Sequence, residues 1–145
     1  GSGSGDNGSN NNGNNPDDND DNNDDTPVSN NLKITIGPVS FNATLDNNET
    51  AKAFKRLLPM TVDMSELHGN EKYYYLSNGL PTASSNPGTI RTGDLMLYGS
   101  TCVVLFYETF STSYTYTRLG RITNPSGLAS ALGSGGVNVT FEITD

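Results

Sequence analysis

The sequence predicts a mainly β protein, a closed or nearly closed antiparallel barrel with two helices packed against it. Three observations lead to this fold class. Most of the chain after residue 30 consists of short segments in which apolar and polar side chains alternate, the period of a half-buried strand. Two segments instead carry helical spacing or helix-capping residues. Closure is expected because an open sheet with this many strands would expose unpaired edges.

The expected strands follow one another with short turns between most of them. The first two form a hairpin broken at Gly37-Pro38. The expected strands are 32–36, 39–45, 60–67, 72–76, 94–98, 101–108, 113–122 and 137–143. The strand at 113–122 is expected to bend at Gly120. Residues 77–93, rich in Gly, Pro, Ser and Asn, predict a long functional loop that is exposed around 84–88.

The hydrophobic period changes to that of a helix between the second and third strands. Asn47 or Asn48 can cap the first turn, and Pro59 ends the helix. The apolar residues on one face are Ala51, Phe54, Leu57 and Leu58. A second, shorter helix is expected at 124–133, because Asn and Pro open this segment and a glycine closes it.

The acidic character of the chain belongs to its first thirty residues. The full net charge is −8, from 8 Lys and Arg against 16 Asp and Glu. Residues 1–30 hold seven Asp and no Lys or Arg, which leaves 8 basic and 9 acidic residues in 31–145, a net of −1. We therefore expect a disordered acidic tether at 1–30 and one folded domain at 31–145. The aspartates of this tether are not followed by the glycine that an EF-hand loop needs at its sixth position, so the tether does not contain an EF-hand calcium site.

Charge and residue counts exclude several classes of function. A nearly neutral domain with an acidic tether lacks the basic face that nucleic acids select. The single cysteine, Cys102, lies in an apolar run and is expected to be a small buried hydrophobic side chain. With His68 as the one histidine, there is no residue set for a zinc site or a Cys–His pair. No metal and no cofactor are expected.

Residues 31–145 resemble a bacterial cyclophilin-like family. The segments that carry the resemblance are ETAKAFKRLLP, MTVDMSELHGNEKYYYL, GTIRTGDLMLYG, VLFYETFSTSYTYTRLGRI and GLASALGSGGVNVTFE, which cover the domain in order. The resemblance implies a closed antiparallel eight-stranded cyclophilin-like β-barrel with two flanking helices. In this frame, Arg118 to Arg121 resemble part of the barrel framework.

The segments that should carry catalysis depart from the family pattern. True cyclophilins isomerise X–Pro bonds with an arginine from a Phe-His-Arg strand motif, and the matching segment here offers Tyr73, Tyr74 and Tyr75. The chain also has no tryptophan. We expect a non-catalytic module that binds a peptide or a small molecule in a groove. The alternative is a peptidyl-prolyl isomerase in which Arg91, at the end of the long loop, replaces the arginine.

The expected groove residues come from the same resemblance. It places the segment 110–116 at one wall of the groove, with Phe110, Tyr114 and Tyr116, and the set is completed by Tyr74 and Phe106. Aromatic rings there would offer flat faces and hydroxyl groups. The alternative is structural, because Tyr114 and Tyr116 are spaced by two and would pack against cross-strand neighbours on one face of a strand.

The tether suggests a location for the protein. A Gly, Ser, Asn and Asp spacer before a compact domain resembles the spacer that follows the lipidated cysteine of bacterial envelope lipoproteins. We therefore expect an extracytoplasmic lipoprotein anchored to the cell envelope. Contact with a membrane is expected only through such a lipid anchor, whose cysteine is not in this sequence, since no segment approaches the ~20 apolar residues of a spanning helix.

Overall fold

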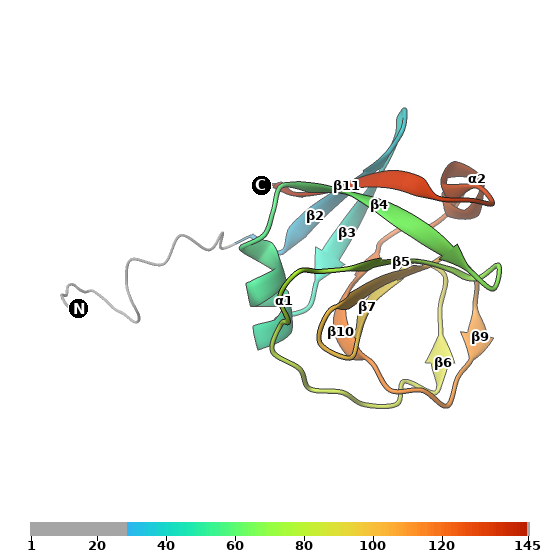
Figure 1. Cartoon of the computed structure of the whole chain (residues 1–145). Coiled ribbons are helices and arrows are strands. Elements are labelled where there is room, and N and C mark those ends of the chain that lie inside the picture. Colours follow the sequence, from blue (N-terminus) through green and yellow to red (C-terminus); the bar gives the residue numbers. More distant parts are fainter. Residues whose placement is uncertain (1–28, 145) are drawn as a thin grey trace.

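Eight antiparallel strands form a closed barrel in the structure, a computed structural model that describes residues 29–144 (Figure 1). The strand order is β10-β3-β2-β11-β4-β5-β8-β7. The strands are β2 (Asn31–Ile36), β3 (Val39–Leu45), β4 (Met60–Leu67), β5 (Glu71–Tyr75), β7 (Asp94–Tyr98), β8 (Cys102–Phe106), β10 (Thr117–Ile122) and β11 (Val137–Thr144). The predicted closed barrel is confirmed. The predicted tether lies outside the described residues, apart from its last two positions.

Two short helices flank the barrel, as predicted. In α1 (Glu49–Lys55) the side chain of Asn48 accepts a hydrogen bond from the Ala51 amide at 2.7 Å, which caps the first turn. Phe54 is fully buried, and its ring meets that of Phe141 edge to face at 5.7 Å. Leu57, predicted on the buried face, is 42% exposed because the helix ends at Lys55.

The second helix is shorter than the sequence indicates. It spans Leu128–Leu132 as α2, and both end residues are buried. Its N-cap is Gly127, in a left-handed conformation, whereas Asn124 was the predicted cap. Asn124 instead accepts a hydrogen bond from the Ser126 amide, so it closes a local turn ahead of the helix.

The strands carry a core on the inside of the barrel and a second apolar layer on the outside. The interior cluster includes Leu95, Leu97, Val103 and Leu105, all almost fully buried. The outer cluster, formed by the alternate side chains of β7 and β8 with neighbouring elements, consists of Ile90, Met96, Cys102, Val104, Phe106 and Tyr116. The two clusters lie on opposite faces because successive side chains of a strand point to opposite sides of the sheet.

Two very short strands outside the barrel lie over this outer layer. β6 (Thr89–Ile90) and β9 (Phe110–Ser111) pair with each other, and Figure 1 shows them at the lower right, in the connections that enter β7 and leave β8. The predicted strand 113–122 is therefore wrong for residues 113–116, which are not part of a barrel strand. Tyr116 makes a single bridge to Ser85 there. The predicted loop 77–93 contains β6, and residues 84–86 and 88 are exposed as expected.

A β-bulge interrupts β10 where the sequence predicts a bend. Arg118 pairs with Met96 and Gly120 pairs with Leu95, so Leu119 is an extra residue on this strand. Position 120 must be glycine because this part of β10 lies close to β3. A Cβ there would lie 2.9 Å from the Leu45 Cα and closer still to the Thr44 carbonyl oxygen. The bulge therefore depends on a glycine beside β3.

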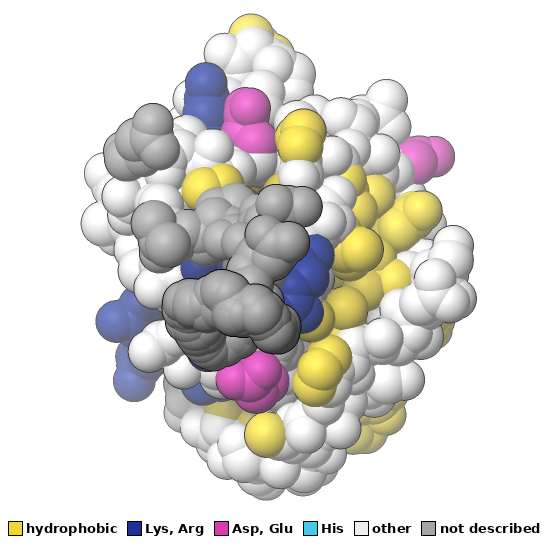
Figure 2. All heavy atoms as spheres, turned by 90° about the vertical axis from the view of Figure 1, so that its left-hand side faces the viewer, with side chains coloured by type: hydrophobic (Ala, Val, Ile, Leu, Met, Phe, Trp, Pro, Cys, Tyr) yellow, Lys and Arg dark blue, Asp and Glu magenta, His cyan; other side chains and the backbone are white. Residues whose placement is uncertain are grey.

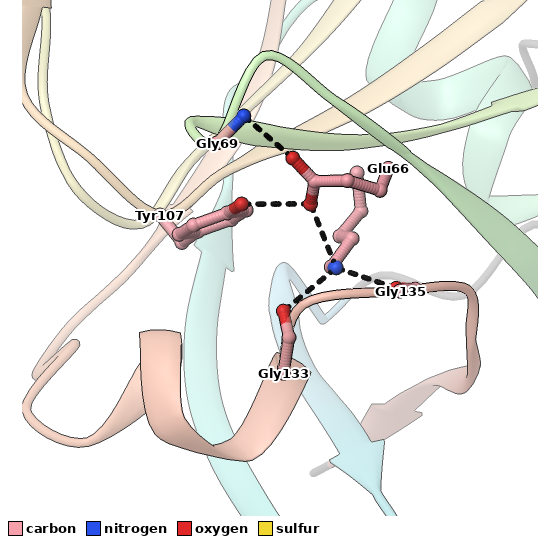
Figure 3. Close-up of polar contacts among 6 residues, drawn as sticks. Glu66, Gly69, Tyr107, Gly133 and Gly135 are labelled. Carbon is pink, nitrogen blue, oxygen red and sulfur yellow. Dashed lines mark hydrogen bonds and ion pairs between the residues drawn. The ribbon is translucent and has the colours of Figure 1, made fainter.

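A buried lysine ties the barrel to the segment after α2 (Figure 3). Lys72 is fully buried, and its Nζ donates to Glu66 Oε1 at 2.8 Å and to the carbonyls of Gly133 at 2.8 Å and Gly135 at 2.6 Å. Burial pushes the pKa of Glu66 upward, but hydrogen bonds from Lys72, the Tyr107 hydroxyl and the Gly69 amide outweigh it and hold that pKa below its ordinary value. All three Lys72 protons are used, so this cation is structural.

Candidate functional site: a tyrosine pocket outside the barrel

A large hollow lies on the outer face of β5 and β8, under the segment that follows β9. Its volume is about 510 Å³. We call it the tyrosine pocket, and its lining consists of Leu67, His68, Asn70, Glu71, Tyr73, Tyr75, Tyr98, Cys102, Val104, Phe110, Ser111, Thr112, Ser113, Tyr114 and Tyr116. Five tyrosines and one phenylalanine give it an aromatic wall. No lysine or arginine lines it.

The strand period decides which tyrosines reach the pocket. Tyr73 and Tyr75 alternate with Tyr74 along β5, so they lie on the outer face and line the pocket. Tyr74 packs against the barrel interior and does not belong to the lining. Of the predicted groove residues, Tyr74 therefore faces the opposite side of the sheet from this pocket.

The rings form two contacting groups, one around Tyr98 and the other of Tyr73 and Tyr75, with edge-to-face and tilted geometry. Tyr98 meets Tyr114 at 6.1 Å with planes at 86°, and it meets Tyr116 at 5.6 Å with planes at 56°. Tyr73 meets Tyr75 at 5.7 Å. Three of these rings remain well exposed: Tyr75 at 64%, Tyr114 at 62% and Tyr98 at 46%. The wall is thus built from rings that contact one another and leave their other surfaces open.

Three of the predicted groove residues come together in this pocket. Phe110, Tyr114 and Tyr116 all line it. Phe106 does not, because it is fully buried, with its ring 5.7 Å from Phe110 and 5.5 Å from Tyr116. Phe106 therefore supports two rings of the wall. The structural alternative for Tyr114 and Tyr116 is wrong about a regular strand, but both rings do pack against Tyr98 of β7. Tyr116 is 5% exposed and belongs to the outer cluster, whereas Tyr114 is 62% exposed.

Two of the missed lining residues are hydrogen-bond acceptors. Asn70 Oδ1 is buried and has no hydrogen-bond partner among the described residues. Burial raises the pKa of Glu71, while His68 opposes that rise. The tight turn between β4 and β5, where His68 takes a left-handed conformation at φ 55°, leads into both acceptors. The alternation of a strand in EKYYY could have indicated that Tyr73 and Tyr75 share one face. Nothing in the sequence indicated that Asn70, Glu71 or Tyr98 would line the same pocket.

Cys102 forms part of the pocket floor and is not activated. It is 6% exposed. Burial, and secondly the carboxylate of Glu71, raise the pKa of its thiol to about 11, although a hydrogen bond with Tyr75 opposes this. A thiol at this pKa is protonated at neutral pH and is a poor nucleophile. The predicted burial of Cys102 is confirmed.

Arg91 lies away from this pocket. It lines a separate hollow beside β7 and β10, which shares only Tyr116 with the tyrosine pocket. Within residues 29–144, no group of three or more His, Cys, Asp and Glu is placed to hold a metal ion. In the same range, no helix has the length and apolar character needed to cross a bilayer.

Hydrophobic side chains also gather on the molecular surface seen from the α1 side. Figure 2 shows them as a band along one edge of that face, with Lys and Arg mainly toward the other edge.

Comparison with known proteins agrees with the architecture. Residues 34–142 match the cyclophilin-like family. The solution structure of a hypothetical protein from Archaeoglobus fulgidus is similar, with a TM-score of 0.55 and 20% identity over 81% of this chain and 96% of that chain. At that identity the likeness shows the fold alone. No curated protein matches the sequence. Because the family match covers well over half of the 145 residues, this chain belongs to the cyclophilin-like family.

Proposed function

We propose that this protein is a binding module that holds a ring-bearing ligand in the tyrosine pocket and does not catalyse a reaction on it. The ligand is a peptide that inserts a proline or an aromatic side chain, or a small molecule with an equivalent ring. The observation that carries the proposal is the aromatic wall itself, in which Tyr75, Tyr98 and Tyr114 stay open to solvent.

Size and lining support this use of the pocket. A volume of about 510 Å³ lies within the range typical of ligand sites. Tyrosine rings offer large flat faces at little cost in side-chain entropy, and aromatic-lined grooves are a recurring way to hold proline-rich segments. The hydroxyl-bearing segment Ser111–Ser113 adds polar groups at the rim.

The two acceptors narrow the ligand further. A buried amide oxygen without a partner costs free energy, and a ligand N–H would relieve that cost at Asn70 Oδ1 if the turn moved enough to uncover this atom. The carboxylate of Glu71, which accepts no hydrogen bond from another described residue, is a second acceptor. A peptide N–H or an amine next to the ring satisfies this arrangement, whereas an anionic ligand does not.

The chemistry of the lining favours binding over prolyl isomerisation. A cyclophilin favours the twisted amide with a fixed cation, and charge-assisted hydrogen bonds are roughly twice as strong as neutral ones. Tyrosine hydroxyls replace any cation here, and they are uncharged at neutral pH. Isomerase activity through Arg91 is the competing proposal, and the same experiment decides between the two.

We include the cell-envelope location in the proposal. Its support is compositional: residues 1–30 are a Gly, Ser, Asn and Asp-rich acidic stretch, typical of a spacer that separates a domain from an anchor. A module of this kind would present the tyrosine pocket outside the cytoplasm. Fractionation of the source cell, with the protein followed by antibody, tests this part alone.

The test of the binding function is a titration by ¹⁵N–¹H NMR with blocked Ala-X-Pro-Ala peptides, where X varies through apolar and aromatic residues. We expect at least one peptide to shift amides around Tyr73, Tyr98 and Tyr114 in a saturable way. Exchange between cis and trans peptide, measured in the same samples, should keep its slow uncatalysed rate of tens to hundreds of seconds.

Two results would overturn the proposal. The first is the absence of any saturable shift with every peptide and with a matched set of small aromatic amines. The second is strong acceleration of cis/trans exchange by the wild type. If Arg91→Ala then abolished that acceleration, the isomerase function would replace the binding function.

A further inference from the structure

A second hollow gathers most of the arginines of the protein. It has a volume of about 270 Å³ and lies beside β7 and β10. We call it the arginine hollow, and its lining consists of Ser85, Pro87, Thr89, Arg91, Asp94, Met96, Tyr116, Arg118 and Arg121. The whole chain contains four arginines, and three of them line this one hollow. In a domain that is nearly neutral, this is a strong local concentration of positive charge.

The β-bulge in β10 brings two of these arginines to one face. Residues separated by three positions lie on opposite faces of a regular strand. The extra residue, Leu119, changes this: Arg118 pairs with Met96 and Arg121 with Asp94, which are two positions apart on β7 and share its outer face. β-bulges often re-aim side chains next to functional sites. The bulge therefore places the positive charges of Arg118 and Arg121 on the same face of the barrel.

The third arginine comes from the end of the long loop. The backbone amide of Arg91 donates to Asp94 Oδ2 at 2.9 Å, so the loop is fixed to the start of β7 at this point. Ser85 and Thr89 of the same loop contribute hydroxyl groups to the lining. Ser85 is itself pinned to Tyr116 by two backbone hydrogen bonds, at 2.9 and 3.0 Å. The hollow is therefore enclosed by β7, by β10 and by a loop that hydrogen bonds hold in place.

The charges of this hollow are not balanced by the protein. Asp94 is the one acidic residue among its lining residues. Arg118 Nε donates to Asp46 at 3.2 Å. The side chains of Arg91 and Arg121 have no hydrogen-bond or ion-pair partner in the described part of the chain, and both are exposed.

The contrast with Lys72 shows what this means. Lys72 is buried with all three protons given to protein acceptors, so it has nothing left for a ligand (Figure 3). Arg91 and Arg121 have their full set of guanidinium donors unused, and they line the same hollow as Arg118. Like charges held together in this way repel, and an anion between them removes the repulsion.

We propose that the arginine hollow is a binding site for an oxyanion, a phosphate, sulfate or carboxylate group of a small ligand. Guanidinium groups match such groups because their planar forks donate two parallel hydrogen bonds. Three of them favour a doubly charged tetrahedral group over a carboxylate. This site goes beyond the proposed peptide binding, since the tyrosine pocket offers acceptors and this hollow offers donors.

The test is a titration of the full chain with inorganic phosphate, sulfate and acetate by ¹⁵N–¹H NMR, at constant ionic strength maintained with chloride. We expect saturable shifts for amides at 85–94 and 117–121, with phosphate and sulfate binding more tightly than acetate. Arg121→Ala removes an exposed side chain and should fold normally. We expect it to weaken phosphate binding by roughly ten- to a hundredfold, the loss of one charged hydrogen-bonding group.

Lys52→Ala is the matched control, because it removes the same charge from the exposed surface of α1. It should leave phosphate binding within about twofold of the wild type, as expected for a distant screened charge. The proposal is overturned if the wild type shows only linear, unsaturated shifts with all three ions. It is equally overturned if Arg121→Ala and Lys52→Ala weaken binding by the same factor.

Discussion

The inner and outer faces of β5, β7 and β8 carry different side chains and differ in exposure. On the inner face, Leu97 and Leu105 are fully buried in the barrel core. On the outer face, Tyr75 and Tyr98 form an aromatic wall and remain 64% and 46% exposed. Apolar surface that stays in contact with water contributes nothing to the hydrophobic stabilisation of the fold. The inner face is thus largely buried, whereas the outer face combines its own buried cluster with exposed aromatic rings, and the proposed ligand site uses those exposed rings.

The largest effect on the free energy of unfolding is expected from a substitution on the inner face. Leu105→Ala removes a fully buried side chain and leaves a cavity, so we expect it to lower the free energy of unfolding by about 3 to 4 kcal/mol. Urea denaturation of both proteins measures the difference. A loss below about 1 kcal/mol would mean that the barrel interior is not the main stabilising core, because such a value is usual for surface positions.

An intermediate effect is expected from Cys102, which lies on the outer face but is buried. The pKa of its thiol is raised from 9.0 to about 11 in the folded protein. Above pH 9 the unfolded chain therefore loses this proton first, and stability that is fully present below pH 9 falls until about pH 11. The loss at the upper limit is about 2 kcal/mol, from a shift of this size.

Urea unfolding at a series of pH values measures this loss, and Cys102→Ala isolates it. The pKa of Tyr107, raised to about 12 by burial and by its hydrogen bond to Glu66, adds a loss of the same sign at higher pH in both proteins. The variant should therefore show a shallower decline between pH 9 and 11. Equal slopes for the two proteins would show that burial of the thiol has no energetic consequence.

Most of the fold follows from the sequence because the strands of this barrel alternate clearly. Segments such as 32–36 and 137–143 have one face in the core, so the period of two is visible in the residue types. The prediction failed at 113–116, where Tyr114 and Tyr116 keep the alternation of a strand. Their partners are the loop residue Ser85 and the ring of Tyr98, contacts between distant segments that a local pattern does not reveal.

The site was predictable only where it lies on one continuous segment. Phe110, Tyr114 and Tyr116 were identified because they lie together in FSTSYTY. The alternation of a strand separates Tyr74 from Tyr73 and Tyr75 but does not say which side faces the pocket, and the structure places Tyr74 toward the barrel interior. Asn70 and the clustering of the three arginines required the folded structure, because a turn and a β-bulge bring those residues into place.

The smallest expected effect on stability belongs to the residue on which the central claim depends most directly. Tyr114 is 62% exposed, so Tyr114→Ala should change the free energy of unfolding by less than about 1 kcal/mol, the range for one aromatic contact and an exposed side chain. Its loss removes one side of the pocket wall. The decisive measurement is the dissociation constant of the best Ala-X-Pro-Ala peptide for the wild type and for Tyr114→Ala. We predict binding at least about tenfold weaker in the variant, the effect of losing roughly 1.4 kcal/mol of contact. Equal affinity in the two folded proteins would contradict the account, because it would mean that the tyrosine pocket is not the place where the ligand binds.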